Sequence, residues 1–351
     1  MDPNRTQYRT VLAIPQIPVG ISLICSVFLP DSPRWLVSKN RYGEALVALA
    51  KLRNKPADDL HVRHEFQEMQ DEITSSRFML AGTSIWVIVK EVATVPSYRS
   101  RFLLGLAMQT VAQWSGGNGI TYYIPEIFRY AGITRNGALI NAGGYGATKL
   151  VLTMVFTWGL IDYFGRRRCF MTGLAVQCTT HIYMAVYMAL WRRHEDEDDD
   201  AVANPAAAAA AVASVFVYAM GWSIGLCTVQ YLYGVEILPT RVRGLCYAVN
   251  MMIHWLFQFA VVRTTPELFR AFDVWGAYVF WAVVCLVGFV VLGVWAPETK
   301  GVPLERMDEL FRGPWYTCWK ARMNDSGDVE SLRADDALVQ PVSVHARTQK
   351  E

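Results

Sequence analysis

Charged residues are scarce in this chain of 351 residues. Asp, Glu, Lys and Arg make up 18% of it, whereas 53% is hydrophobic. This composition is unusual for a soluble domain and ordinary for a protein that crosses a membrane several times. A soluble all-helical protein is the alternative, but its long uncharged runs would expose too much apolar surface to water. The sequence therefore predicts an all-α membrane protein.

Recognisable enzyme motifs are also missing. The chain has no phosphate-binding loop, no metal-ligand cluster and no Ser or Cys nucleophile beside a base. We therefore predict no enzyme, no cofactor and no metal, and no nucleic-acid partner is expected. Most of the seven cysteines fall within apolar segments, where Cys behaves as a small hydrophobic residue. Cys178 and His181 lie one helical turn apart, but two ligands do not make a zinc site, so packing is the better interpretation.

Seven long apolar segments are present, each long enough, at about 1.5 Å per residue, to cross a hydrocarbon core of about 30 Å. They cover residues 10–29, 102–124, 138–161, 170–191, 206–232, 245–263 and 275–296. The first is too long, and too interrupted by Pro15 and Pro18, to resemble a signal peptide. The sequence therefore predicts seven transmembrane helices in a lipid bilayer.

Basic residues are distributed unevenly between the two sides of this membrane. Lys and Arg are concentrated in the loops that follow the odd-numbered segments and in the tail. By the positive-inside rule that side is cytoplasmic, so the N-terminus is expected outside and the C-terminal tail inside. The acidic run 195–200 then falls in an outer loop, where we interpret it as a solvated surface.

Six short motifs follow one another in a fixed order. They are P-D-S-P-R-W-L (30–36), R-F-L-L-G-L-A-M-Q (101–109), Q-W-S-G-G-N-G-I-T-Y-Y (113–123), D-Y-F-G-R-R (162–167), V-E-I-L-P-T-R-V-R-G (235–244) and P-E-T-K-G-V-P-L-E-R-M-D-E-L-F (297–311). Together, over residues 8–311, they resemble the sugar porters of the major facilitator superfamily. The run G-G-Y-G-A-T-K (143–149) is similar to fungal members, such as sugar, hexose or lactose-like permeases.

The resemblance implies twelve helices in two six-helix halves, with the sugar bound between the halves. This chain would be N-terminally truncated and begin near the sixth helix, followed by the complete C-terminal half. The expected domains are an extracellular start with the last helix of the first half (1–29), a cytoplasmic central loop (30–101), a six-helix bundle (102–296) and a cytoplasmic tail (297–351). Since alternating access needs two halves, we do not expect this chain to transport by itself.

Two stretches of the central loop, 42–52 and 61–77, are predicted to form short amphipathic helices. Ala45, Leu46, Leu49 and Leu52 would form the apolar face of the first. We expect both helices to lie at the membrane surface beneath the bundle.

A sugar is a neutral polyol, which amide and hydroxyl groups can bind while aromatic rings stack on its C–H face. The second segment contains such groups, and Gly116, Gly117 and Gly119 let that helix bend or let a neighbour approach. The resemblance adds an aromatic and an amide in the sixth segment, and in the fifth segment Tyr231 stands where the family usually has a tryptophan. The predicted substrate-binding residues are Gln113, Asn118, Tyr122, Tyr231, Trp255 and Gln258. For each of them, packing or hydrogen bonding between helices is the alternative.

Charged residues cluster at the cytoplasmic ends of the third and fifth segments. Opposite charges there can pair when an inner gate is shut and separate when it opens. The predicted gating network consists of Asp162, Arg166, Arg167, Glu236 and Arg243. Topology alone is the alternative role for the arginines. We expect Arg243→Ala in a complete protein to favour inward opening.

Several positions depart from the family pattern. Ala112 stands where the family commonly has a second glutamine, and the two prolines expected in the fifth segment are absent, which removes the expected helix break. His254 replaces an expected asparagine and is a candidate proton acceptor or sugar donor, with hydrogen bonding between helices as the alternative. Lys149, near the middle of the third segment, should face the interior of the bundle.

The predicted function is transmembrane transport of a mono- or disaccharide by a secondary transporter of the plasma membrane. The resemblance implies that the acid that couples transport to H⁺ belongs to the first helix, which this chain would lack. The sequence therefore leaves both facilitative and H⁺-coupled transport open. The alternatives are a sugar-binding sensor that does not transport and a half-size subunit that pairs with another half.

Overall fold

The structure is a computed structural model that describes residues 9–10, 12–80, 84–133, 135–197, 205–302, 307–311, 316, 318, 322–323 and 329–330. Over these residues the chain is helical apart from one short ribbon, in which β1 (Arg322–Met323) pairs antiparallel with β2 (Val329–Glu330). The chain divides into two compact units, Met1–Thr83 and Ser84–Glu351. The prediction of an all-helical fold is confirmed apart from this ribbon.

The first unit contains four described helices. They are α2 (Gln16–Val27), α3 (Pro33–Ser38), α4 (Tyr42–Arg53) and α5 (Leu60–Leu80). Both amphipathic helices predicted for the central loop are therefore confirmed as helices. The prediction was wrong for Leu52, which is 57% exposed, because α4 buries Ala48, Leu49 and Ala50 beside Ala45 instead. Asn54, in the left-handed conformation, ends α4.

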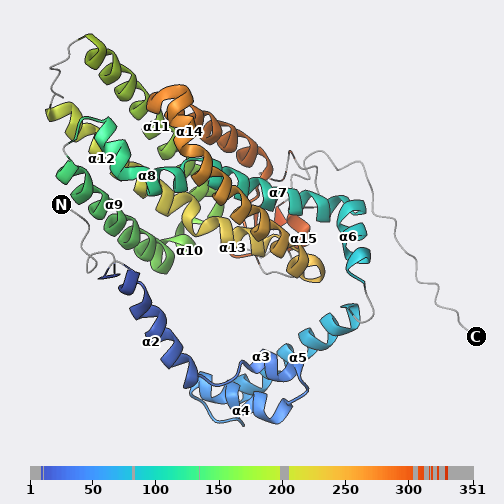
Figure 1. Ribbon diagram of the computed structural model, residues 1–351. Helices are drawn as coiled ribbons and strands as arrows, with labels where there is room; N and C mark the ends of the chain where they lie inside the picture. Colours follow the sequence, from blue (N-terminus) through green and yellow to red (C-terminus); the bar gives the residue numbers. More distant parts are fainter. Residues whose placement is uncertain are drawn as a thin grey trace, which may run out of the picture. The chain divides into compact units, whose positions relative to one another are not determined.

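The second unit is a bundle whose long helices lie side by side (Figure 1). The α-helices are α6 (Ile85–Thr94), α7 (Pro96–Trp114), α8 (Gly117–Tyr130), α9 (Arg135–Val155), α10 (Ile161–Phe164), α11 (Arg166–Glu197), α12 (Pro205–Trp222), α13 (Val229–Glu236), α14 (Thr240–Trp295) and α15 (Met307–Leu310). Two π-helical turns connect some of them, η1 (Phe156–Leu160) before α10 and η2 (Ser223–Cys227) before α13.

Several predicted segments differ from the helices observed. The second segment is not one helix over 102–124, because Gly116 adopts a φ of 91° and separates α7 from α8. The sixth and seventh segments both belong to α14, which is broken at Asp273 by a φ of 55° and a ψ of 175°. In the fifth segment, where the prolines are missing, η2 interrupts the α-helical path instead.

One hydrophobic core extends through the second unit and contains large buried side chains such as Phe170, Tyr278 and Trp281. Helices approach most closely at small residues. A Cβ added to Gly173 of α11 would lie 2.3 Å from the Cα of Gly225 in η2. Glycine at both positions is what allows these two backbones to touch.

Among the described residues, two helices are long and apolar enough to cross a membrane by length and composition. They cover Ala206–Glu236 and Arg241–Trp295, with mean hydropathies of 1.7 and 2.5. The break at Gly116 divides the second predicted segment, and buried polar residues such as Gln177 and His181 make α11 less apolar. The count of seven spanning helices therefore stays a prediction.

Candidate functional site

The break between α7 and α8 is held in the middle of the bundle by its neighbours. The carbonyl of Ser115 lies 3.0 Å from Nε2 of His181 on α11. Gly117 has no room for a side chain, since an added Cβ would lie 2.3 Å from the indole of Trp222. The predicted purpose of these glycines, a bend and a close approach, is confirmed.

A chain of hydrogen bonds runs from this break across the bundle. Asn118 Nδ2 donates to Gln113 Oε1 at 2.7 Å, and Gln113 Nε2 lies 2.8 Å from His254 Nε2. His254 Nδ1 lies 2.7 Å from Gln109 Oε1, and Gln109 Nε2 donates to the carbonyl of Gln230 at 3.2 Å. The chain joins α8, α7, α14 and α13. Gln109, Gln113 and His254 are all buried.

His254 is the centre of this chain. Its Nδ1 lies 2.7 Å from the amide oxygen of Gln109 and its Nε2 lies 3.1 Å from the hydroxyl of Tyr231. The amide nitrogen of Gln113 lies 2.8 Å from Nε2 and 3.0 Å from Nδ1. A neutral ring with its proton on Nδ1 donates to Gln109 and offers the single lone pair of Nε2 to Gln113 and Tyr231, which share it. His254 therefore makes the inter-helix hydrogen bonds that were the alternative to a direct functional role.

Gln109 is a member of the site that the sequence did not predict, and it is fully buried. It lies four residues before Gln113, so both amides share one face of α7. This four-residue spacing is the feature of the sequence that could have identified Gln109 as a member of the site.

The chain ends at Asn118, where it is open. Asn118 is half-buried, and among the described residues its Oδ1 has no hydrogen-bond partner. Tyr122, one turn further along α8, is 58% exposed, and Trp255 on α14 is 61% exposed. Gln258, one turn beyond His254, is half-buried. The structure thus joins Gln113, Asn118 and Tyr231 through His254 and leaves the other three predicted substrate residues outside the buried chain.

Lys149 of α9 contacts the turn of α8 that follows Asn118. Its Nζ donates to Thr121 Oγ1 at 3.0 Å and lies 5.2 Å and 5.8 Å from the ring centroids of Trp222 and Tyr145. The prediction that this side chain faces the interior of the bundle is confirmed by these contacts.

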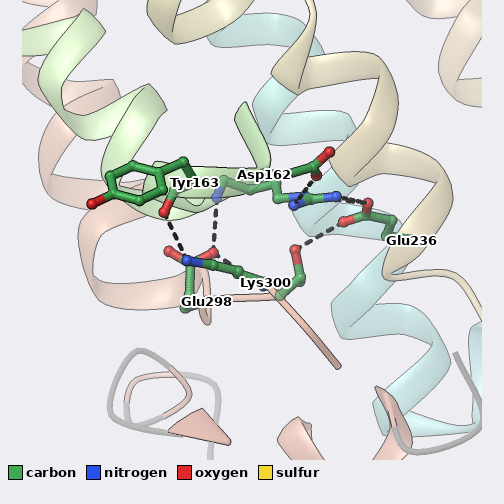
Figure 2. A network of polar contacts seen from close by, with 7 residues as sticks. Asp162, Tyr163, Glu236, Glu298 and Lys300 are labelled. Carbon is green, nitrogen blue, oxygen red and sulfur yellow. Dashed lines mark hydrogen bonds and ion pairs between the residues drawn. The ribbon is translucent and has the colours of Figure 1, made fainter. Parts of the chain in front are cut away.

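A second polar cluster lies where α10 meets α11 (Figure 2). The Arg166 guanidinium lies 2.8 Å from Asp162 and 3.0 Å from Glu236, and its backbone N–H donates to Glu298 at 2.8 Å. Glu236 also accepts a hydrogen bond of 2.9 Å from Thr299 Oγ1. The cluster ties the start of α11 to the end of α13 and to the segment after α14.

The members of this cluster differ in exposure. The Arg166 and Glu236 side chains are 15% and 21% exposed, whereas Asp162 is 80% exposed. Burial lowers the pKa of Arg166, but the carboxylates of Glu236 and Asp162 more than offset this, so the pKa is raised. Glu298 and Thr299 belong to the P-E-T-K-G motif, which was the signal that could have placed them here.

Two arginines of the predicted gating network make contacts with backbone carbonyls beside this cluster. Arg167 Nε donates to the carbonyl of Ala296 at 2.8 Å, and Arg243 Nε donates to that of Leu238 at 3.0 Å. The structure therefore brings Asp162, Arg166 and Glu236 together as ion pairs and places Arg167 at the end of α14.

A cavity that the sequence did not predict lies among α8, α11 and α14. Its volume is about 440 Å³, and Tyr123, Glu126, Trp191 and Phe269 are among the residues that line it. It adjoins the break in α14, since Asp273 also lines it.

Three comparisons relate this chain to known proteins. The family described as "Sugar (and other) transporter" matches residues 2–311. A quinate permease of Emericella nidulans is 27% identical over 95% of this chain and 62% of its own length. A probable quinate permease of Aspergillus niger is 29% identical over 89% of this chain and 57% of its own length. The chain thus spans about 60% of the length of these relatives.

A solved structure has a similar fold. It is the major facilitator superfamily proton:xylose symporter XylE bound to 6-bromo-6-deoxy-D-glucose, with a TM-score of 0.63 and 21% sequence identity. The match covers 87% of this chain and 59% of that protein. At this identity the likeness supports the fold.

Proposed function

We propose that this chain, which belongs to the sugar transporter family, forms the substrate-binding C-terminal half of a secondary transporter for a sugar or a related small polyol. The family is one of multi-pass membrane transporters rather than enzymes, and the fold is that of the major facilitator superfamily. Two relatives bear the name quinate permease or probable quinate permease, so quinate, a cyclic polyol, is one candidate substrate alongside hexoses and disaccharides.

The buried chain from Asn118 to Gln230 supports this proposal best. Gln113 is held between Asn118 and His254, so its amide cannot rotate freely. Asn118 stands at the half-buried end, and its Oδ1 has no hydrogen-bond partner within the described part of the chain. Such fixed amides can accept and donate to hydroxyl groups without first losing rotamer freedom. The proposed site also includes the exposed Tyr122 of α8 and, on α14, the exposed Trp255 and the half-buried Gln258.

The proposed arrangement in the membrane follows the sequence. Seven spanning helices, an outer N-terminus and a cytoplasmic tail in the plasma membrane agree with the distribution of Lys and Arg. The domain boundaries 1–29, 30–101, 102–296 and 297–351 belong to this proposal. The Arg166 cluster would then lie on the cytoplasmic side, where ion pairs between helix ends can stabilise a closed gate.

Proton coupling is left open in this proposal. His254 is a titratable group at the centre of the site, but its two ring nitrogens already have partners within the bundle. Facilitative and H⁺-coupled transport are therefore both compatible with the arrangement of the described residues.

Ligand binding to the purified chain tests the proposal without requiring transport. The chain in lipid nanodiscs would be titrated with radiolabelled quinate and glucose by equilibrium dialysis. We expect saturable binding of at least one of them, weakened about tenfold or more by Gln113→Ala, because truncation removes a preorganised hydrogen-bonding group and the acceptor that holds the Asn118 amide in place. Gly143→Ala, a position with open space around it, is the matched control. Absence of saturable binding to the folded chain would contradict the proposed function.

A further inference from the structure

Lys149 of α9 carries a positive charge between the helices of the second unit. Its ammonium group donates to the hydroxyl of Thr121 at 3.0 Å and faces the rings of Trp222 and Tyr145. Among the described residues, no Asp or Glu forms an ion pair with it. The ammonium group therefore has a hydroxyl and two aromatic faces as partners, and none of these is an anion.

These neutral contacts do not balance the cost of placing the charge there. A cation–π contact contributes about 0.5–2 kcal/mol, and a hydrogen bond to a neutral hydroxyl about 1 kcal/mol. Taking an ammonium ion out of water costs several kcal/mol even after the protein relaxes. Charged groups within a membrane are accordingly paired or functional. Lys149 therefore requires an anion that its described neighbours do not supply.

The position of Lys149 links it to the amides of the proposed site. Thr121, which accepts its hydrogen bond, lies three residues beyond Asn118 on α8, so both side chains share one face of that helix. Trp222, which faces the ammonium group, also packs against Gly117. The positive charge and the open end of the amide chain thus flank the same turn of α8.

We propose that the ligand of this site is a polyhydroxylated carboxylic acid in its anionic form. Its carboxylate binds the ammonium group of Lys149, while its hydroxyl groups bind Gln113 and Asn118. The inference rests on the proposed function and deepens it by naming the chemical class of the substrate. A neutral polyol would leave Lys149 without an anion, so the site should discriminate against it by about tenfold or more.

The test compares an acid with its neutral ester. Quinate and methyl quinate differ in charge but share the ring and hydroxyl groups, and glucose serves as a neutral sugar. Each would compete with radiolabelled quinate for the full chain in nanodiscs, in the wild type, Lys149→Met, Lys149→Arg and Lys90→Met. Lys90 is an exposed residue of α6 and controls for the loss of one positive charge.

We expect quinate to bind the wild type and Lys90→Met about tenfold or more tightly than its ester. In Lys149→Met the ratio should approach one, whereas Lys149→Arg should keep a preference for the acid, because the positive charge is retained. Equal affinity for acid and ester in the wild type would overturn the inference, even if Lys149→Met failed to fold. A preference for the acid that survives Lys149→Met would also overturn it. In both cases saturable binding would leave the proposed function intact. If radiolabelled quinate did not bind, direct titration with radiolabelled glucose would separate the two proposals: binding of glucose alone would overturn this inference, and binding of neither would remove both.

Discussion

The contributions of the two Arg166 ion pairs to stability can be measured separately, because the acidic partners of Arg166 differ in exposure. Arg166 and Glu236 are 15% and 21% exposed, whereas Asp162 is 80% exposed. An exposed ion pair contributes about 0–1 kcal/mol, and removing one partner of a buried pair costs about 3–5 kcal/mol. The pair with Glu236 lies between these limits, so we expect a coupling energy of about 2 kcal/mol for it. For the pair with Asp162 we expect less than about 0.5 kcal/mol.

Two double-mutant cycles, one for each ion pair, measure these coupling energies separately. The variants are Arg166→Ala combined with Glu236→Gln in one cycle and with Asp162→Asn in the other. Glutamine keeps an oxygen that can accept the hydrogen bond from Thr299, so the substitution removes mainly the charge. The free energy of unfolding would be measured in mixed detergent micelles with increasing sodium dodecyl sulfate.

Equal coupling energies in the two cycles, or a larger one with Asp162, would refute this reasoning. Arg168→Ala is the control, because Arg168 is exposed and belongs to the same basic run. If Arg168→Ala cost as much stability as Arg166→Ala, the net charge of the loop would matter rather than the contacts of Arg166.

Three further changes test other parts of the structure. Removing the imidazole in His254→Ala leaves buried amides without partners and should lower the free energy of unfolding by about 1–3 kcal/mol, whereas His254→Asn should cost less; thermal unfolding in detergent measures both. Gly117→Ala places a Cβ 2.3 Å from an indole and should destabilise by about 1–3 kcal/mol, while Gly143→Ala, with open space around it, should be neutral or slightly stabilising in the same assay. The hydrogen bond from Arg53 lowers the pKa of Glu65 below its ordinary 4.5, so this contact stabilises the first unit above that pH and is lost as the pH falls through the lowered pKa. The protection of α5 against hydrogen exchange, corrected for the intrinsic pH dependence of amide exchange, should therefore fall with acid in the wild type and depend less on pH in Glu65→Gln; an identical pH response in both would contradict this assignment.

The sequence predicted helices better than it predicted where they break. Apolar length located the long segments, and the loop helices α4 and α5 were found from their periodicity. Gly116 marked the break between α7 and α8 only as a residue that permits bending, because a glycine permits a positive φ but does not require one. The break at Asp273 had no signal of this kind, since a non-glycine residue rarely adopts that conformation.

For the polar residues of the site, the sequence likewise identified the residues but not their partners. The sequence identified Gln113, Asn118 and His254 because an amide or imidazole within an apolar helix needs a partner. It could not identify the partner, since that depends on the rotation of several helices about their axes. Gln109 was missed for this reason, although it shares a face with Gln113.

His254 and Lys149 looked alike in the sequence, as titratable residues in apolar segments, and the structure separates them. The two ring nitrogens of His254 have partners on three other side chains, so the bundle itself accounts for this residue. Lys149 has a hydroxyl and two aromatic faces but no anion among the described residues. A buried polar group whose requirement is met explains how the helices pack, whereas one whose requirement is unmet indicates what binds. For that reason Lys149, rather than His254, is the residue that we expect to determine which ligands this site accepts.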